Sequence, residues 1–158
     1  MLCQNKNRRL GMLDDLTNLQ ALLKDSTLLA TRGYVAGEWC DGENGQTFPV
    51  YNPARGDVIT DVADISRTQT AEAISIAEKA QKLWAARPAK ERSNLLRNWY
   101  NLMMENQEDL ATILTAEQGK PIEEAKGEIA YGASFIEFFA EEAKRVYGET
   151  IPGHQSDK

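Results

Sequence analysis

The feature that most constrains this chain is a helical period that starts after Ile65 and persists for about 80 residues. Ser66 and Gln69 match a capping box, in which both side chains bind backbone groups at a helix start. We therefore predict a helix from Arg67 to about Ala86. Its expected inward face consists of Ala73, Ile76, Ala77, Ala80 and Trp84.

Proline and glycine divide the rest of this pattern into two more helices. Pro88 suits the first turn of a second helix, Gly119 its C-terminal cap and Pro121 the start of a third. The third helix is expected to end near Tyr147, with Gly148 as its cap. The expected inward residues of the second helix are Leu95, Trp99, Leu102, Met103, Leu110, Ile113 and Leu114. Those of the third are Ile129, Ala133, Ile136, Phe139, Ala140 and Ala143.

The preceding residues, 33–62, are rich in turn-forming residues and in short β-prone runs. They predict a small antiparallel meander with strands at Gly33–Val35, Glu38–Cys40, Thr47–Tyr51 and Val58–Val62. Leucines spaced over residues 12–25 predict a short helix before it. The expected fold is thus mostly helical: an N-terminal helix, a small antiparallel meander and three amphipathic helices.

Composition excludes several classes of function. The net charge is −6, with 24 acidic against 18 basic residues, whereas nucleic-acid binders carry basic patches. No apolar run approaches the ~20 residues that span a membrane. Of the two cysteines, Cys3 lies in a terminus expected to be loose, so a disulfide framework is not indicated. We expect a cytoplasmic protein that binds neither nucleic acid nor membrane.

Few side chains qualify for chemistry. His154 lies beyond the last predicted helix, and a general base needs a positioned partner. Cys40 has no neighbouring cation to activate a thiolate. Glu124 and Glu128 share a helix face, and they could form an acid–base or metal pair, but no histidine accompanies them. Read from its residues, the chain contains no self-contained active site.

Several phrases of the sequence resemble the aldehyde dehydrogenase family. They are VAGEW at Val35–Trp39, NPARG at Asn52–Gly56, ERSNLLR at Glu91–Arg97 and EQGKP at Glu117–Pro121. The long stretch Glu124–Lys158 resembles the bacterial succinate-semialdehyde dehydrogenases of that family in particular.

The resemblance implies an α/β fold in which residues 1–32 are an extension with a short helix. Residues 33–158 would then be the N-terminal part of the cofactor-binding domain, truncated before the catalytic domain. Complete members are homo-oligomers that oxidise an aldehyde, here succinate semialdehyde, with NAD⁺ or NADP⁺. Their catalytic cysteine, glutamate base and cofactor-binding turn have no counterpart in this sequence. We therefore assign no catalytic or cofactor-binding residue, and we expect the chain alone to be inactive.

One family site can be transferred. Some members bind a monovalent cation through backbone carbonyls before the Asn-Pro turn and an acid before the Gly-Lys corner. The corresponding residues here are Val50, Tyr51 and Glu117, although several relatives have aspartate at the last position. The alternative is that Glu117 caps a helix or forms a salt bridge at the corner.

Three hypotheses for function follow. In the first, the chain is the N-terminal portion of a succinate-semialdehyde dehydrogenase, present as a fragment or truncated reading frame. In the second, it is a stand-alone interaction module that pairs with full-length aldehyde dehydrogenase subunits. The third, a free-standing helical enzyme, would use Glu124, Glu128 and His154. Because its amphipathic helices lack partners, the chain is expected to be marginally stable or prone to aggregate.

Overall fold

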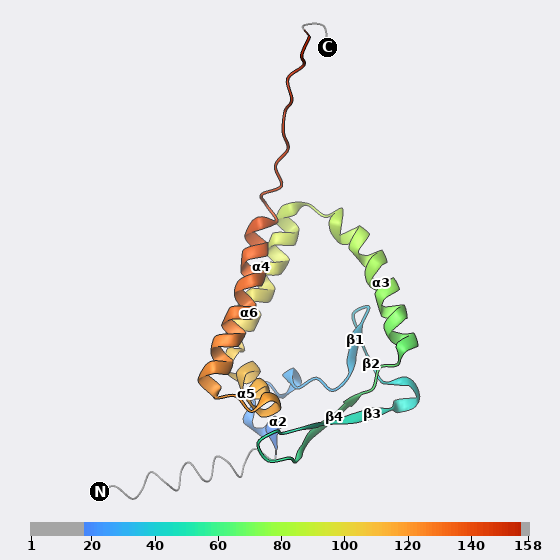
Figure 1. Ribbon diagram of the computed structural model, residues 1–158, viewed down its shortest axis with the longest axis vertical. Helices are drawn as coiled ribbons and strands as arrows, with labels where there is room; N and C mark the ends of the chain where they lie inside the picture. The colour runs from blue at the N-terminus through green and yellow to red at the C-terminus, as the bar shows by residue number, and fades with distance from the viewer. Residues whose placement is uncertain (1–17, 156–158) are drawn as a thin grey trace, which may run out of the picture.

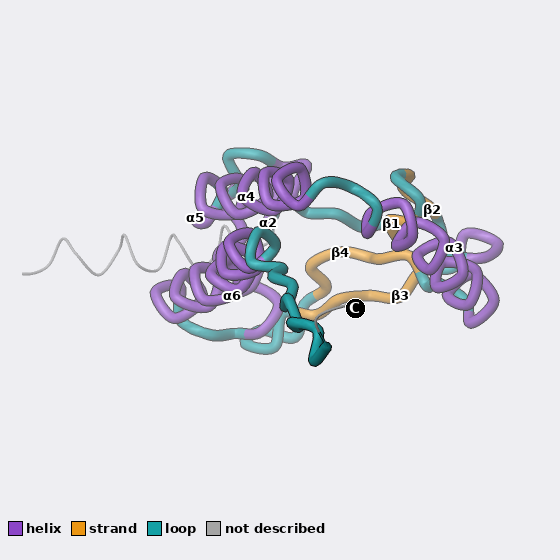
Figure 2. The backbone as a smooth tube through the Cα atoms, turned by 90° about the horizontal axis from the view of Figure 1, so that it is seen from above, coloured by secondary structure: helices purple, strands orange, loops and turns teal. Residues whose placement is uncertain are grey.

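A computed structural model describes residues 18–155 of the chain as an open arrangement of helices and two hairpins (Figure 1). The elements, in chain order, are α2 (Leu19–Leu22), the 3₁₀ turn η2 (Ser26–Leu28), β1 (Gly33–Val35), β2 (Glu38–Cys40), the 3₁₀ turn η3 (Glu43–Gly45), β3 (Thr47–Tyr51), β4 (Val58–Ala63), α3 (Arg67–Ala85), α4 (Ala89–Glu105), α5 (Gln107–Gln118) and α6 (Ile122–Glu142). Viewed from above, α4, α5 and α6 lie on one side, while α3, β1 and β2 lie on the other (Figure 2).

The strands form two separate antiparallel pairs, β1–β2 and β3–β4, and the predicted single meander is wrong in this respect. Ala36 and Gly37 connect the first pair with positive φ angles of 56° and 88°, which suit the twist of a two-residue hairpin. Between β2 and β3 the chain turns through η3 instead of pairing. Gly42 lies so close to the backbone oxygens of Gln46 and Asp64 that a Cβ there would collide with them.

The start of α3 is fixed by the predicted capping box. The Gln69 amide accepts from Glu43 N–H, in addition to Ser66 N–H, and donates to the Asp41 carbonyl. The box therefore joins α3 to the connection between the two hairpins. The expected inward face of α3 is not buried, because no described element covers it along its length. Ala77 and Ala80 are exposed, whereas Ala73, Ile76 and Trp84 are half-buried.

The packed part of the molecule is formed by α4 and α5 lying against α6. Its buried apolar residues are all alanines: Ala111, Ala116, Ala125, Ala133 and Ala140. The continuous second helix that we predicted is wrong, because the chain breaks at Asn106 into α4 and α5. The side-chain amide of Asn106 donates to the Leu102 carbonyl, and the backbone carbonyl of Asn106 accepts from Leu110 N–H. Asn106 therefore ends α4 and begins α5.

Part of the expected core lies on the surface. Leu95, Trp99 and Leu102, which we call the α4 outer face, are 44%, 56% and 58% exposed. Phe139, expected to point inward, is also exposed. The third helix ends at Glu142 and not at Tyr147, so Gly148 caps nothing. Since Val146 and Tyr147 find no surface to pack against, the helix has no tertiary contact to extend it.

Ion pairs fasten the helices to one another. Arg97 on α4 donates to Glu137 at 2.5 Å and to Glu141 at 2.6 Å, both on α6. Lys126 on α6 pairs with Glu108 on α5 and with Glu123 one turn earlier on α6. The hydrogen bonds from Arg97 and from Lys144 hold the pKa of Glu141 below its ordinary value, with Lys144 contributing more.

The predicted helix over residues 12–25 is much shorter where it can be described. It comprises Leu19–Leu22, and residues 12–17 lie outside the described part of the chain. Leu19 and Leu23 are buried where α2 packs on α5.

Candidate functional site

The predicted site residues lie around the point where the β3–β4 turn meets the end of α5. Asn52, which follows β3, is 5% exposed, and its side-chain oxygen accepts from Ala54 N–H at 2.9 Å. Its backbone N–H donates to Asp57 and its carbonyl accepts from Gly56. Asn52 therefore fixes the turn from inside, as asparagine commonly does at such positions.

The turn is closed on its outer side by an ion pair. The Arg55 guanidinium donates to both carboxylate oxygens of Asp57, at 2.9 and 2.7 Å. These hydrogen bonds lower the pKa of Asp57 below its ordinary value. Gly56 lies between them with a φ of 79°, a conformation that favours glycine.

Pro53 brings this turn against the Gly119–Pro121 corner. Gly119 caps α5 in the left-handed conformation, with φ 73° and ψ 8°, as the sequence predicts. A Cβ at Gly119 would lie 3.1 Å from Pro53 Cγ, tighter than an ordinary van der Waals contact. The two phrases NPARG and EQGKP, more than 60 positions apart, are therefore in contact.

The residues proposed to bind a cation flank this contact. Val50 and Tyr51 are the last two residues of β3, and the pairing with β4 shifts its register between them. Glu117 lies in the last turn of α5 and is exposed. Among residues 18–155, none forms a hydrogen bond or ion pair with the Glu117 carboxylate, so the salt bridge considered as the alternative is not seen there.

The other candidates do not converge on one place. His154 is exposed beyond α6, and Cys40 is a half-buried free cysteine at the end of β2. Glu128 pairs with Lys120, which removes it from an acid–base pair with Glu124. No three histidine, cysteine or acidic side chains gather as a metal site within the described residues.

Sequence reasoning missed one buried charged group, Asp109 in the first turn of α5. It is 4% exposed, and its two carboxylate oxygens accept from Lys24 N–H and Asp25 N–H. An acid in a first helical turn is ordinarily read as a favourable charge for the helix dipole, so no local signal marks this contact.

Over the described part of the chain, none of the helices has the length and apolar character required to cross a bilayer.

Comparison with known proteins gives a consistent result. The sequence model of the aldehyde dehydrogenase family matches residues 39–158. The glutarate-semialdehyde dehydrogenase of Pseudomonas putida is 60% identical over 136 residues, which cover 86% of this chain and 28% of that protein. The succinate-semialdehyde dehydrogenase (NADP+) GabD of Escherichia coli is 55% identical over 136 residues, with the same coverage. The mitochondrial succinate-semialdehyde dehydrogenase of Arabidopsis thaliana is 44% identical over all 158 residues.

A solved structure, described as an Escherichia coli NADP-dependent enzyme, superposes with a TM-score of 0.80 at 55% identity. The match covers 85% of this chain and 28% of that structure. The chain thus spans about 28% of the length of these relatives and corresponds to their N-terminal part. The expected fold class, an α/β architecture whose part seen here is mostly helical, is confirmed, with two small antiparallel strand pairs in place of the expected meander.

Proposed function

Because the chain belongs to the aldehyde dehydrogenase family, we propose that it is the N-terminal part of an enzyme for the NAD(P)-dependent oxidation of a dicarboxylic acid semialdehyde. Such a substrate carries one carboxylate besides its aldehyde group. The observation that carries this proposal is the identity of 60% and 55% to enzymes named for glutarate and succinate semialdehyde. Those two aldehydes differ by one methylene, and they define the proposed substrate class.

In this proposal the chain contributes architecture and no chemistry of its own. When bound in a complete enzyme, the nicotinamide accepts a hydride from the substrate. Cys40 is a half-buried free cysteine, and His154 is exposed and has no hydrogen-bond or ion-pair partner among the described residues. What the chain contributes is structural: the close contact between Gly119 and Pro53, and large exposed apolar faces on α4 and α6.

A chimera tests the proposal. The homologous N-terminal part of the Escherichia coli GabD enzyme would be replaced by residues 39–158 of this chain. We expect the chimera to form NADPH, measured at 340 nm, with succinate or glutarate semialdehyde, and the 158-residue chain alone to form none. A folded, soluble chimera that is inactive on both aldehydes would contradict the proposal, as would turnover by the purified chain alone.

We further propose that the backbone carbonyls of Val50 and Tyr51, together with the Glu117 carboxylate, bind a monovalent cation such as K⁺. Three features support this: the register shift at Val50 and Tyr51, the contact of Pro53 with Gly119, and the unpaired Glu117 carboxylate among the described residues. Oxygen donors of this kind suit hard cations.

The cation proposal predicts that KCl raises Tm more than tetramethylammonium chloride at equal ionic strength. Glu117→Gln should abolish that difference, whereas Glu72→Gln, an exposed acid on α3, should preserve it. If the two salts raise the Tm of the unaltered protein equally, the proposal is contradicted.

A second candidate function, the interaction module that pairs with full-length subunits, is favoured by one observation. The α4 outer face and the α6 outer face, which we define as Tyr131, Phe135 and Phe138, are exposed large apolar side chains. Surfaces of this kind mark interaction sites. This function would be supported if the chain co-purifies with a co-expressed full-length aldehyde dehydrogenase and if Trp99→Glu abolishes the co-purification. A monomeric chain that does not bind the full-length enzyme would contradict it.

The compartment stays a proposal too. We propose the cytoplasm, although two of the plant relatives are mitochondrial enzymes. Cell fractionation with an antibody to the chain would test it, and recovery with a membrane-enclosed organelle would contradict it.

A further inference from the structure

One segment of the molecule bridges its two halves. Residues 19–32, which we call the strap, lie against α5 at one end and enter the β1–β2 hairpin at the other (Figure 1). The strap has little regular structure, with one helical turn in α2 and the 3₁₀ turn η2. It therefore depends on side-chain contacts with the elements on each side.

At the α5 end, Asp109 holds the strap by its backbone. Its Oδ1 accepts from Lys24 N–H at 3.1 Å and its Oδ2 from Asp25 N–H at 2.8 Å. Both oxygens of a 4% exposed carboxylate are thus used by residues about 85 positions away in the sequence. Hydrogen bonds to a charged acceptor are among the stronger ones in proteins. Two leucines four positions apart, Leu19 and Leu23, are buried beside them.

At the hairpin end, the strap is held by a different set of contacts. Ala63 N–H, at the end of β4, donates to the Thr31 carbonyl at 2.8 Å. The Arg32 guanidinium pairs with both oxygens of Asp41 at 2.7 and 3.0 Å. None of these contacts involves Asp109, so the two ends of the strap are fastened independently.

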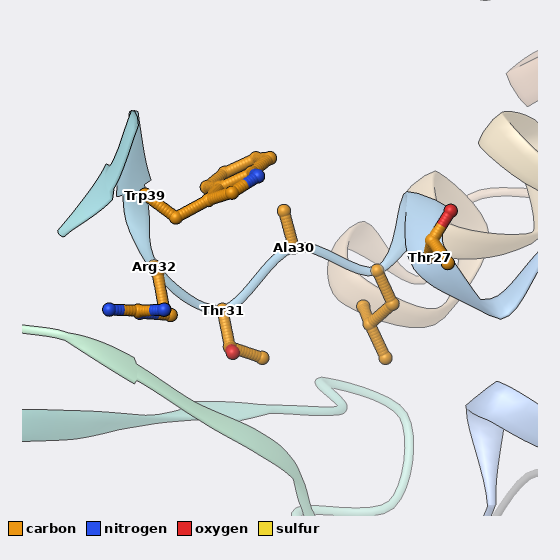
Figure 3. Close-up of a pocket in the computed structure, with 6 residues that line it drawn as sticks. Thr27, Ala30, Thr31, Arg32 and Trp39 are labelled. Carbon is orange, nitrogen blue, oxygen red and sulfur yellow. The ribbon is translucent and has the colours of Figure 1, made fainter. Parts of the chain in front are cut away.

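Between its ends the strap is loosely covered. Residues 24–27 and Ala30 are exposed, and the hollow beside Thr27, Ala30 and Trp39 has a volume of about 230 Å³ and opens to solvent (Figure 3). η2 is held from within, because Asp25 accepts from Thr27 N–H and Thr27 Oγ1. In the middle of the strap only Leu28 and Leu29 are half-buried, and none of residues 24–30 is fully buried.

We propose that Asp109 is a latch for the strap. With its carboxylate engaged, residues 19–29 are docked on α5 and tie the hairpins to the helices. When it is disengaged, residues 19–29 open as one unit that pivots at Thr31, while α4, α5 and α6 stay packed. The strap is thus a conformational switch that is held closed by the Asp109 carboxylate together with the buried Leu19 and Leu23.

Amide hydrogen exchange on the full chain, measured for Asp109→Asn and Asp109→Ala, tests the latch. The informative amides are Leu23, Leu28 and Leu29, which bond within the strap and not to Asp109. If the strap opens as a unit, the amides of these three leucines should all exchange faster, by about tenfold to a hundredfold. The increase should be larger in Asp109→Ala than in Asp109→Asn. Ala63 and the amides of residues 125–140 should keep their rates. Glu108→Gln, the neighbouring exposed acid that pairs with Lys126, serves as the control and should leave the strap unchanged.

Two results would overturn the latch: unchanged exchange at the three leucines in both variants, or acceleration by the same factor in the strap and in α6. If the Asp109 variants do not fold, the variant Leu23→Ala provides the test. It alters the strap and not α5, and it should accelerate Leu28 and Leu29 while Ala63 stays protected. Acceleration of Ala63 along with them would likewise refute an opening that pivots at Thr31.

Discussion

Because Gly119 contacts Pro53, replacing this glycine by alanine should lower the free energy of unfolding. The same replacement at Gly127 should raise it. Gly119→Ala places a Cβ in a left-handed conformation, at φ 73°, and 3.1 Å from Pro53 Cγ. The conformation alone costs roughly 1–2 kcal/mol for a residue other than glycine. The close contact adds to this, so we expect the free energy of unfolding to fall by about 2 kcal/mol.

Gly127→Ala is the matched control. Gly127 lies inside α6, its φ is not positive, and a Cβ there would meet no atom within 4 Å. Alanine is favoured over glycine in a helix by roughly 0.5–1 kcal/mol. The control should therefore be stabilised by about that amount.

Urea unfolding followed by circular dichroism at 222 nm measures both effects. A Pro53→Ala background separates the two causes, because it removes Cγ and leaves the backbone strain at Gly119. In that background the cost of Gly119→Ala should shrink to the part that comes from the left-handed conformation alone. If Gly119→Ala and Gly127→Ala change stability equally, or if Pro53→Ala leaves the cost of Gly119→Ala unaltered, the argument for the corner is refuted.

Three further predictions concern the ion pairs and the start of α3. Arg97→Ala should lower Tm, and the loss should be smaller in 1 M than in 0.05 M NaCl because salt screens the half-buried, solvent-accessible pairs with Glu137 and Glu141; a salt-independent loss would contradict this. Hydrogen bonds from lysine or arginine lower the folded-state pKa values of Glu141, Glu108 and Asp57. Their contribution is therefore present above the unfolded-state pKa and lost as pH falls through the folded-state value, so Tm should decline below about pH 4.5; a Tm that rises on acidification would refute it. Ser66→Ala should reduce stability by about 1 kcal/mol through loss of the capping box, with faster amide exchange at Gln69, whereas Ser75→Ala, inside α3, should not.

The local features were predictable from the sequence because their signals are local. The capping box needs Ser66 and Gln69 three positions apart, and the left-handed cap needs a glycine at 119. The four strands were placed within a residue by turn-forming residues at their ends. Which strands pair was mispredicted, because pairing of β2 with β3 is prevented by η3 and the tight approach at Gly42.

The core was predictable only in part from the helical periodicity of apolar residues. A helical period identifies the apolar face of a helix but not the surface that covers it. Ala133 and Ala140 were correctly placed inward on α6, whereas Trp99 and Leu102 are exposed on α4. The break at Asn106 was missed because no proline or glycine marks it; the asparagine ends α4 through a bond from its own side chain to Leu102.

Around the candidate site, the sequence could point to residues but not to their neighbours. Val50, Tyr51 and Glu117 were named by resemblance, and their role as cation ligands stays a prediction. Asp109 was not predicted, because its partners are the backbone groups of Lys24 and Asp25, and a backbone group leaves no mark in the sequence.

The central claim is that the α4 and α6 outer faces belong against another part of an aldehyde dehydrogenase, and that this chain supplies structure and no catalysis. The most direct measurement is the fluorescence of the dye ANS, which binds exposed apolar surface, compared between the 158-residue chain and the chimera at equal concentration. The account predicts strong emission from the chain, reduced by Trp99→Glu, and weak emission from the chimera. Weak emission from a cooperatively folded chain alone would contradict it.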